Sequence, residues 1–241
     1  MRFLGSSFFA VVVAAGTGER MNTPLPKQYL PLLGKPVLVH TLEAFEQCEA
    51  ISEFVVVIHP LHEEIFRREV LKKYGFQKLR HYVFGGATRQ DSVYEGLKLY
   101  RDRLEDFVLI HDGVRPLVSK GILKRCVEEV AQFGAVCVAI PSVDTLKLSS
   151  DGKTIEGTLD RKRVWRAQTP QAFRIGLILE AFERAREEGF YGTDDASLVE
   201  RLGFPVRIVP GSEENLKITT PQDFLIAEEM LRWRVRWLRQ E

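Results

Sequence analysis

Short apolar runs recur along the chain and alternate with longer segments of mixed polarity. Most runs are four to six residues long and rich in Val, Ile and Phe, which is typical of strands buried on both faces of a sheet. The runs are Phe8–Val13, Phe54–Ile58, His81–Phe84, Phe107–Ile110, Ala135–Ile140 and Val206–Val209. Each of them is predicted to form a β-strand.

The segments between these runs place apolar residues three and four positions apart, a pattern that predicts helices. They are Val37–Gln47, Glu63–Tyr74, Gln90–Arg103, Lys120–Phe133, Ile175–Glu188 and, at the end of the chain, Pro221–Arg239. The alternation predicts an α/β fold with a Rossmann-like, doubly wound and mostly parallel sheet. Ligands of such sheets bind beyond the carboxyl ends of the strands, so the residues that follow each strand are the candidates for chemistry.

Residues 142–163 interrupt this alternation. Short alternating segments surround the turn sequence Ser149-Ser150-Asp151-Gly152, which predicts an inserted β-hairpin. This β-arm has little core of its own, so we expect it either to reach a partner subunit or to lie over the active site. No repeat, low-complexity tract or linker divides the sequence, and residues 1–241 are predicted to form one domain.

The charge balance argues against a nucleic acid or a membrane as the partner. Lys and Arg number 34 and Asp and Glu 33, so the molecule as a whole attracts no polyanion and any anion site must be local. The apolar run near the N-terminus falls far short of the ~20 residues that a membrane span requires. We expect a cytoplasmic protein in which Cys48, Cys126 and Cys137 are reduced packing residues.

The first apolar run leads into a loop that suits a phosphate chain. The loop residues are small: Ala14, Ala15, Gly16, Thr17 and Gly18. Small residues let backbone N–H groups approach a phosphate closely, and Arg20 and Lys27 can supply positive charge. Met21 stands where a dinucleotide-binding fingerprint has its third glycine, and no Gly-Lys-Ser/Thr follows to make a Walker A loop. A tight strand-to-helix turn with two solvated cations is the alternative interpretation.

Two further strand ends carry candidate site residues. Gly85, Gly86 and Ala87 leave room for a flat base after the His81–Phe84 run, and Ser92 can hydrogen-bond a base or cap a helix.

Asp112 follows the Phe107–Ile110 run. A carboxylate there can bind Mg²⁺, because this ion needs one or two protein carboxylates when phosphates supply its other ligands. An Asp that closes a turn is the structural alternative. The H-x-x-H pair His59 and His62 is interrupted by Pro60 and lacks a third ligand, so both histidines are predicted to be surface residues.

Successive segments resemble the motifs of one enzyme family. The string AAGTGERM…PKQYL is similar to the N-terminal signature of sugar-nucleotide pyrophosphorylases and their small cytidylyltransferase relatives. Further matches are GGATRQDSVYEGL (85–97), HDGVRPLV (111–118), VDTLK (143–147), LDRKRVWRAQTPQAF (159–173), GTDDASLVE (192–200) and ENLKITTPQDF (214–224). Because they cover nearly the whole chain in the right order, the sequence is identified as a member of the methylerythritol-phosphate cytidylyltransferase family.

The resemblance implies the nucleotide-diphospho-sugar transferase type of fold and an enzyme of isoprenoid precursor synthesis. Its members use CTP and Mg²⁺ to transfer a cytidylyl group to 2-C-methyl-D-erythritol 4-phosphate, with release of pyrophosphate. The loop 14–18, the residues 85–87 and Ser92 would bind the nucleotide, and Asp112 the metal. The catalytic cations would be Arg20, Lys27, Arg161 and Lys217, and the residues that contact the second substrate would be Arg115, Thr145, Thr169 and Thr193. The β-arm would form a homodimer and carry Arg161 to the neighbouring site.

Two other functions stay open at this point. Ribitol-5-phosphate cytidylyltransferase has the same fold, nucleotide and chemistry with a longer, unbranched polyol, and the motifs do not separate the two substrates. A non-catalytic nucleotide-binding module would keep the fold. The joint presence of the candidate cations and Asp112 argues against that module, since a decayed site would lack some of them.

Overall fold

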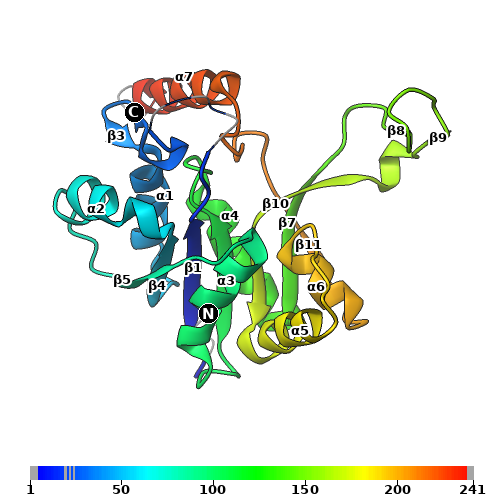
Figure 1. Cartoon of the computed structure of the whole chain (residues 1–241), viewed down its shortest axis with the longest axis horizontal. Helices are drawn as coiled ribbons and strands as arrows, with labels where there is room; N and C mark the ends of the chain where they lie inside the picture. Colours follow the sequence, from blue (N-terminus) through cyan, green and yellow to red (C-terminus); the bar gives the residue numbers. More distant parts are fainter. Residues whose placement is uncertain (1–4, 19–20, 22, 24, 238–241) are drawn as a thin grey trace.

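The computed structural model describes residues 5–18, 21, 23 and 25–237. Within these residues a seven-stranded sheet has the order β11-β7-β10-β6-β1-β4-β5 (Figure 1). The strands are β1 (Phe8–Ala14), β4 (Glu53–Ile58), β5 (Leu79–Phe84), β6 (Phe107–Asp112), β7 (Ala135–Pro141), β10 (Trp165–Arg174) and β11 (Arg207–Pro210). β10 is antiparallel to β6 and β7, whereas the other neighbours in this sheet are parallel. The predicted Rossmann-like α/β fold is confirmed.

Helices cover both faces of this sheet. They are α1 (Val37–Glu46), α2 (Glu63–Phe66), α3 (Arg89–Leu97), α4 (Lys120–Phe133), α5 (Ile175–Glu187), α6 (Asp195–Arg201) and α7 (Pro221–Trp237). Alternate residues of β1 supply two separate cores: Phe8, Ala10 and Val12 pack with α1 and α4, while Phe9 and Val11 pack with α3, α5 and α6. Both faces of the strand are therefore buried, which is why its sequence is apolar without a break.

Two of the predicted helices change character before they end. The segment predicted as a helix over 63–74 is α2 followed by a π-helical turn at Arg67–Leu71. The one predicted over 90–103 is α3 followed by a 3₁₀ turn at Lys98–Tyr100. The sequence pattern indicates where each helix lies, but not how its last turns are hydrogen-bonded.

The sequence pattern does not predict β10 or α6. β10 inserts between β6 and β7, with Gln171 opposite Ile110 on one side and Cys137 on the other. Its buried half includes the polar residues Gln168, Thr169 and Gln171, so it lacks the apolar run by which the other strands are recognised. The pairing with β7 shifts register between Ala167 and Gln171.

The predicted β-arm is present between β7 and β10, and it projects away from the body of the molecule in Figure 1. Its two strands, β8 (Lys147–Leu148) and β9 (Gly157–Thr158), form a separate antiparallel pair, so the arm stands outside the main sheet. Apolar side chains on the arm lie open to solvent: Val143 is 65% exposed and Ile155 64%. A second small ribbon pairs β2 (Pro31–Leu32) with β3 (Lys35–Pro36).

Two expectations drawn from composition can be compared with the structure. Cys48, Cys126 and Cys137 are buried free thiols, as expected of packing residues. Among the described residues, no helix has the length and apolar character needed to cross a bilayer.

Close packing of α3 on the sheet yields a stability prediction. A Cβ at Gly96 would lie 2.6 Å from Val11 Cγ1 and 3.0 Å from Val57 Cγ2. Gly96→Ala is therefore expected to lower the free energy of unfolding by ~1–3 kcal/mol, although alanine is the better helix former. The matched control is Gly121→Ala in α4, where the nearest atom to the new Cβ is 3.5 Å away, so stability should stay equal or rise by up to ~1 kcal/mol. Urea unfolding measures both variants, and equal changes would contradict the packing argument.

Candidate active site

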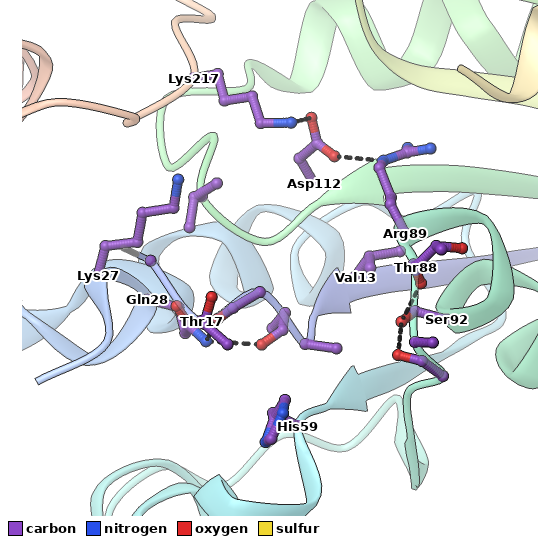
Figure 2. Close-up of a pocket in the computed structure, with 17 residues that line it drawn as sticks. Val13, Thr17, Lys27, Gln28, His59, Thr88, Arg89, Ser92, Asp112 and Lys217 are labelled. Atoms are coloured by element: carbon purple, nitrogen blue, oxygen red, sulfur yellow. Dashed lines mark hydrogen bonds and ion pairs between the residues drawn. The ribbon is translucent and has the colours of Figure 1, made fainter. Parts of the chain in front are cut away.

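A cavity of about 550 Å³ opens beyond the carboxyl ends of β1, β4 and β6. Its wall comes from the loop after β1, the turn at Lys27–Tyr29, the start of α3, and the segment that precedes α7 (Figure 2). Eleven of the predicted site residues line it: Ala14, Ala15, Gly16, Thr17, Gly18, Lys27, Gly86, Ala87, Ser92, Asp112 and Lys217. Strand ends thus gather these distant motifs at one edge of the sheet.

Gly85 closes the gap between two walls of this cavity. A Cβ there would fall 2.5 Å from Ser92 Oγ and 2.6 Å from Ala15 Cβ. The residue therefore has to be small for the loop after β5 to approach the loop after β1.

The loop after β1 is held in shape by polar groups of the chain itself. The side-chain amide of Gln28, a residue only 1% exposed, donates to the carbonyls of Ala14 at 2.8 Å and Gly16 at 2.9 Å. Gly18 has a φ of 80°, where a side chain would be strained, and its carbonyl accepts the Met21 N–H at 2.9 Å. Gln28, which follows this loop in the sequence, thus holds the loop in place through two hydrogen bonds.

Asp112 is the centre of a charge network at the opposite wall. Its Oδ1 accepts a hydrogen bond from Arg89 Nε at 3.2 Å, and its Oδ2 lies 3.0 Å from Lys217 Nζ and 3.3 Å from Arg115 Nε. Burial by itself would raise the pKa of this carboxyl, but the three cations outweigh burial and hold the pKa well below its usual range. Asp112 is therefore ionised at neutral pH.

Arg89 links this network to α6. Its two terminal nitrogens lie 2.9 and 2.8 Å from the two oxygens of Asp195, a residue 1% exposed. Such a two-pronged contact fixes the plane of the guanidinium. The five side chains of the network hold three positive and two negative charges, so one positive charge is left to attract an anion.

Arg115 and Thr169 lie behind Asp112 instead of in the wall. Arg115 Nη1 donates to the carbonyl of Asn215 at 2.7 Å, while the Asp112 N–H donates to Thr169 Oγ1 at 3.1 Å. Thr169 Oγ1 also hydrogen-bonds His111 Nδ1 at 3.0 Å, and burial lowers the pKa of that histidine to about 3. Both residues predicted to contact the second substrate therefore support Asp112 from the protein side.

The remaining predicted site residues lie apart from the cavity. Arg161 begins a single 3₁₀ turn on the β-arm, capped by Asp160, and Thr145 is exposed on the same arm. Thr193 is exposed just ahead of α6. None of the three is among the described residues that line the cavity of their own chain. Arg20 lies outside the described residues.

Several residues of the site escape the sequence analysis. No role was assigned to Arg89 from the sequence, although a cation directly after a strand and loop is a signal for the ligand edge. Asp195 has no local signal, because its partner Arg89 is 106 positions away. His59 and His62, predicted to be surface residues, are both partly exposed; in addition His59 lines the cavity, and the ring of His62 packs edge-on against Tyr29.

Comparison with known proteins decides the family. The family model described as IspD, 2-C-methyl-D-erythritol 4-phosphate cytidylyltransferase, matches residues 8–233. The chain belongs to this family. The resemblance seen in the motifs is thereby confirmed over almost the full sequence.

Individual IspD relatives match over nearly their whole length. A protein of Syntrophus aciditrophicus named 2-C-methyl-D-erythritol 4-phosphate cytidylyltransferase is 49% identical over 225 residues, which cover 92% of this chain and 95% of that protein. One of the same name from Geobacillus kaustophilus is 45% identical, with 93% and 97% covered. The crystal structure of 4-diphosphocytidyl-2C-methyl-D-erythritol synthase from Anaerococcus prevotii has a TM-score of 0.82 at 34% identity, covering 95% of this chain and 97% of that one.

The buried pair of Arg89 and Asp195 gives a prediction on stability. Asp195→Asn leaves the guanidinium without one of its two carboxylates in a largely buried place, so the free energy of unfolding should fall by about 3 kcal/mol. The matched control is Glu105→Gln, which breaks the exposed pair with Arg174, 3.4 Å apart, and should cost less than ~1 kcal/mol. Urea unfolding at neutral pH compares the two variants. If the free energy of unfolding fell by the same amount in both variants, the buried pair of Asp195 with Arg89 would stabilise the fold no more than an exposed ion pair.

Proposed function

We propose that this cavity is where the chain carries out the reaction of the IspD family. The chain transfers a cytidylyl group from CTP to 2-C-methyl-D-erythritol 4-phosphate, and forms 4-diphosphocytidyl-2-C-methyl-D-erythritol and pyrophosphate on the route to isoprenoid precursors. The observation that supports the location is one cavity that joins a small-residue loop to Lys27, Arg89 and Lys217. We place the reaction in the cytoplasm, a compartment that suits three free thiols.

The nucleotide is proposed to lie along the loop after β1. At about 550 Å³ the cavity is within the range of roughly 300–1,000 Å³ usual for ligand sites. The triphosphate would contact Gly16, Thr17 and Gly18 together with Lys27 and Arg20, and the base would lie between Ala14–Ala15 and the residues 85–87. This arrangement puts the small residues at the base and the charges at the phosphates.

Ser92 supports cytosine as the base. Its Oγ donates to the carbonyl of Thr88 at 2.9 Å, and as long as it does so this oxygen offers a hydrogen-bond acceptor to the cavity. The exocyclic amine of cytosine is a donor, whereas uracil presents a carbonyl at the same place. An acceptor at Ser92 therefore favours CTP over UTP.

The chemistry requires positive charge more than an acid or a base. A phosphate monoester has its second pKa near ~6, so the attacking phosphate is mostly dianionic at neutral pH and needs no general base. The enzyme has to align two anions and stabilise charge that develops on the α-phosphoryl group and the leaving pyrophosphate. We assign that stabilisation to Lys27 and Arg20, and the positioning of the attacking phosphate to Lys217 and Arg161. Arg115 and Thr169 would support this end of the site through Asp112, and Thr145 and Thr193, which lie outside the cavity of their own chain, are proposed to contact the substrate when the dimer forms.

Asp112 fits the role of magnesium ligand. It is ionised and is the one carboxylate among the described residues of the cavity wall. The described part of the chain holds no cluster of three or more His, Cys, Asp or Glu side chains that could bind a metal, as suits an ion held mostly by substrate phosphates. Bound there, Mg²⁺ would supply Lewis-acid stabilisation of the phosphates. The side chain of Lys217 is 37% exposed and could then turn from Asp112 to a phosphate.

The β-arm supports a homodimer. Arg161 and Thr145 lie on the arm, apart from the cavity of their own chain, and the arm presents the exposed apolar residues Val143 and Ile155. We propose that a second copy covers these residues and receives Arg161 at its own cavity.

The test of the reaction is pyrophosphate release from CTP and Mg²⁺. We expect strong release with 2-C-methyl-D-erythritol 4-phosphate and weak release with ribitol 5-phosphate, each supplied alone. Release with ribitol 5-phosphate only would assign the chain to the other cytidylyltransferase. If neither polyol phosphate gave pyrophosphate release, a non-catalytic nucleotide-binding role would become the leading function.

Mixed dimers test the role of the arm. Lys27→Ala is expected to lower kcat at least ~100-fold, the scale of losing one charge-stabilising group, and Arg161→Ala to lower it as well. If Arg161 acts across the dimer, heterodimers of the two variants contain one intact site and should recover part of the activity. The control is Lys124→Ala on α4, whose side chain is 75% exposed and which should keep full kcat. Verified heterodimers without recovery would show that each arm serves its own chain.

A further inference from the structure

His59 stands at the end of the cavity that we assign to the base. It follows β4 directly, where Ile58 is the register partner of Ala14, and the carbonyl of Ile58 accepts the Gly85 N–H at 2.8 Å. His59 is thereby set beside both backbone segments of the base site. Figure 2 shows it across the drawn site from Asp112 and Lys217.

The ring of His59 is held from behind. Its Nδ1 accepts the Leu61 N–H at 3.2 Å, and its centroid lies 4.9 Å from that of the His62 ring. The His62 ring in turn meets Tyr29 in an edge-on contact at 5.9 Å, and Tyr29 is only 3% exposed. A row of aromatic rings therefore runs from the core to the cavity wall and ends at His59. A ring fixed in this way loses little freedom when a ligand packs on it.

The chemistry of this ring suits a base better than a phosphate. Because Nδ1 accepts a hydrogen bond, the neutral imidazole carries its proton on Nε2, so it presents a flat apolar surface and one donor. Lys27 and Lys217 lie on the far side of the drawn site from His59 (Figure 2). Arg89 is paired with Asp112 and Asp195. The His59 ring is the last in the row of aromatic rings, so the planar ring of a ligand can pack on its open face.

We propose that His59 is the wall on which the pyrimidine ring of CTP packs, and that it determines affinity for the nucleotide without taking part in phosphoryl chemistry. The proposal rests on the proposed function, because it takes CTP as the occupant of the cavity. It adds a base-contacting residue to a site otherwise built from backbone groups and small side chains.

Direct binding tests the proposal with three ligands: CTP, CMP and inorganic tripolyphosphate, each titrated calorimetrically in the presence of Mg²⁺. Base-on-aromatic packing is worth ~1–3 kcal/mol, so His59→Ala should raise the Kd of both CTP and CMP roughly 5- to 160-fold. The Kd of tripolyphosphate, which has no base, should stay the same. His59→Phe keeps a flat ring and should recover most of the affinity for CTP and CMP. In steady state, His59→Ala should raise KM for CTP while kcat changes less than about twofold.

The controls separate this contact from damage to the fold. His81→Ala, an exposed residue of β5, should leave all three Kd values as in the natural protein. An equal loss for tripolyphosphate in His59→Ala, or unchanged binding of CMP, would overturn the proposal. So would a His59→Phe variant that binds CTP no better than His59→Ala. Failure of the natural protein to bind CTP would instead overturn the proposed function, and the inference with it.

Discussion

A buried carboxylate ties together the parts of the chain that make the site. Asp112 at the end of β6 pairs with Arg89 of α3, with Arg115 and with Lys217 ahead of α7, and Arg89 reaches on to Asp195 of α6. A charge is costly to bury unless its partners are in place, so these elements have to be arranged correctly at the same time. The sheet positions the strand end, but the charge network fixes the helices around it.

The loop after β1 is likewise held by polar groups of the chain itself. Gln28 satisfies two carbonyls of the loop after β1, and the excess positive charge of the network faces the same cavity. Polar groups that are already oriented need no rearrangement as charge develops, which is the main way that a protein assists a reaction between two anions. The contacts that stabilise the fold are therefore also those that would stabilise the transition state of the proposed reaction.

The local sequence was sufficient to predict much of the sheet and part of the candidate site. Strands buried on both faces, such as β1 and β4, are recognised as apolar runs. The segment that follows β1 and the end of β6 indicated Lys27 and Asp112, whereas Lys217 came only from the resemblance to the family. β10 was missed because its buried positions include polar residues, among them Thr169 and Gln171, whose partners come from distant segments. Asp195 was missed for the same reason. The place of His59 in the cavity wall was not predicted, because its spacing from His62 was considered only as a metal-binding motif, whereas the row of rings depends on tertiary packing.

The late position of Asn215 and Lys217 bears on how the protein is made. Asp112 and Arg115 leave the ribosome well before the residues that complete their surroundings, since Arg115 and Asn215 are separated by 100 positions. At roughly 5–20 residues per second, this interval lasts on the order of 5–20 s. During that time the nascent chain can pair its first strands, yet the charge network lacks its last members. The charge network is therefore completed only after Asn215 and Lys217 have been synthesised, when the strands of the sheet have already been made and have had time to pair.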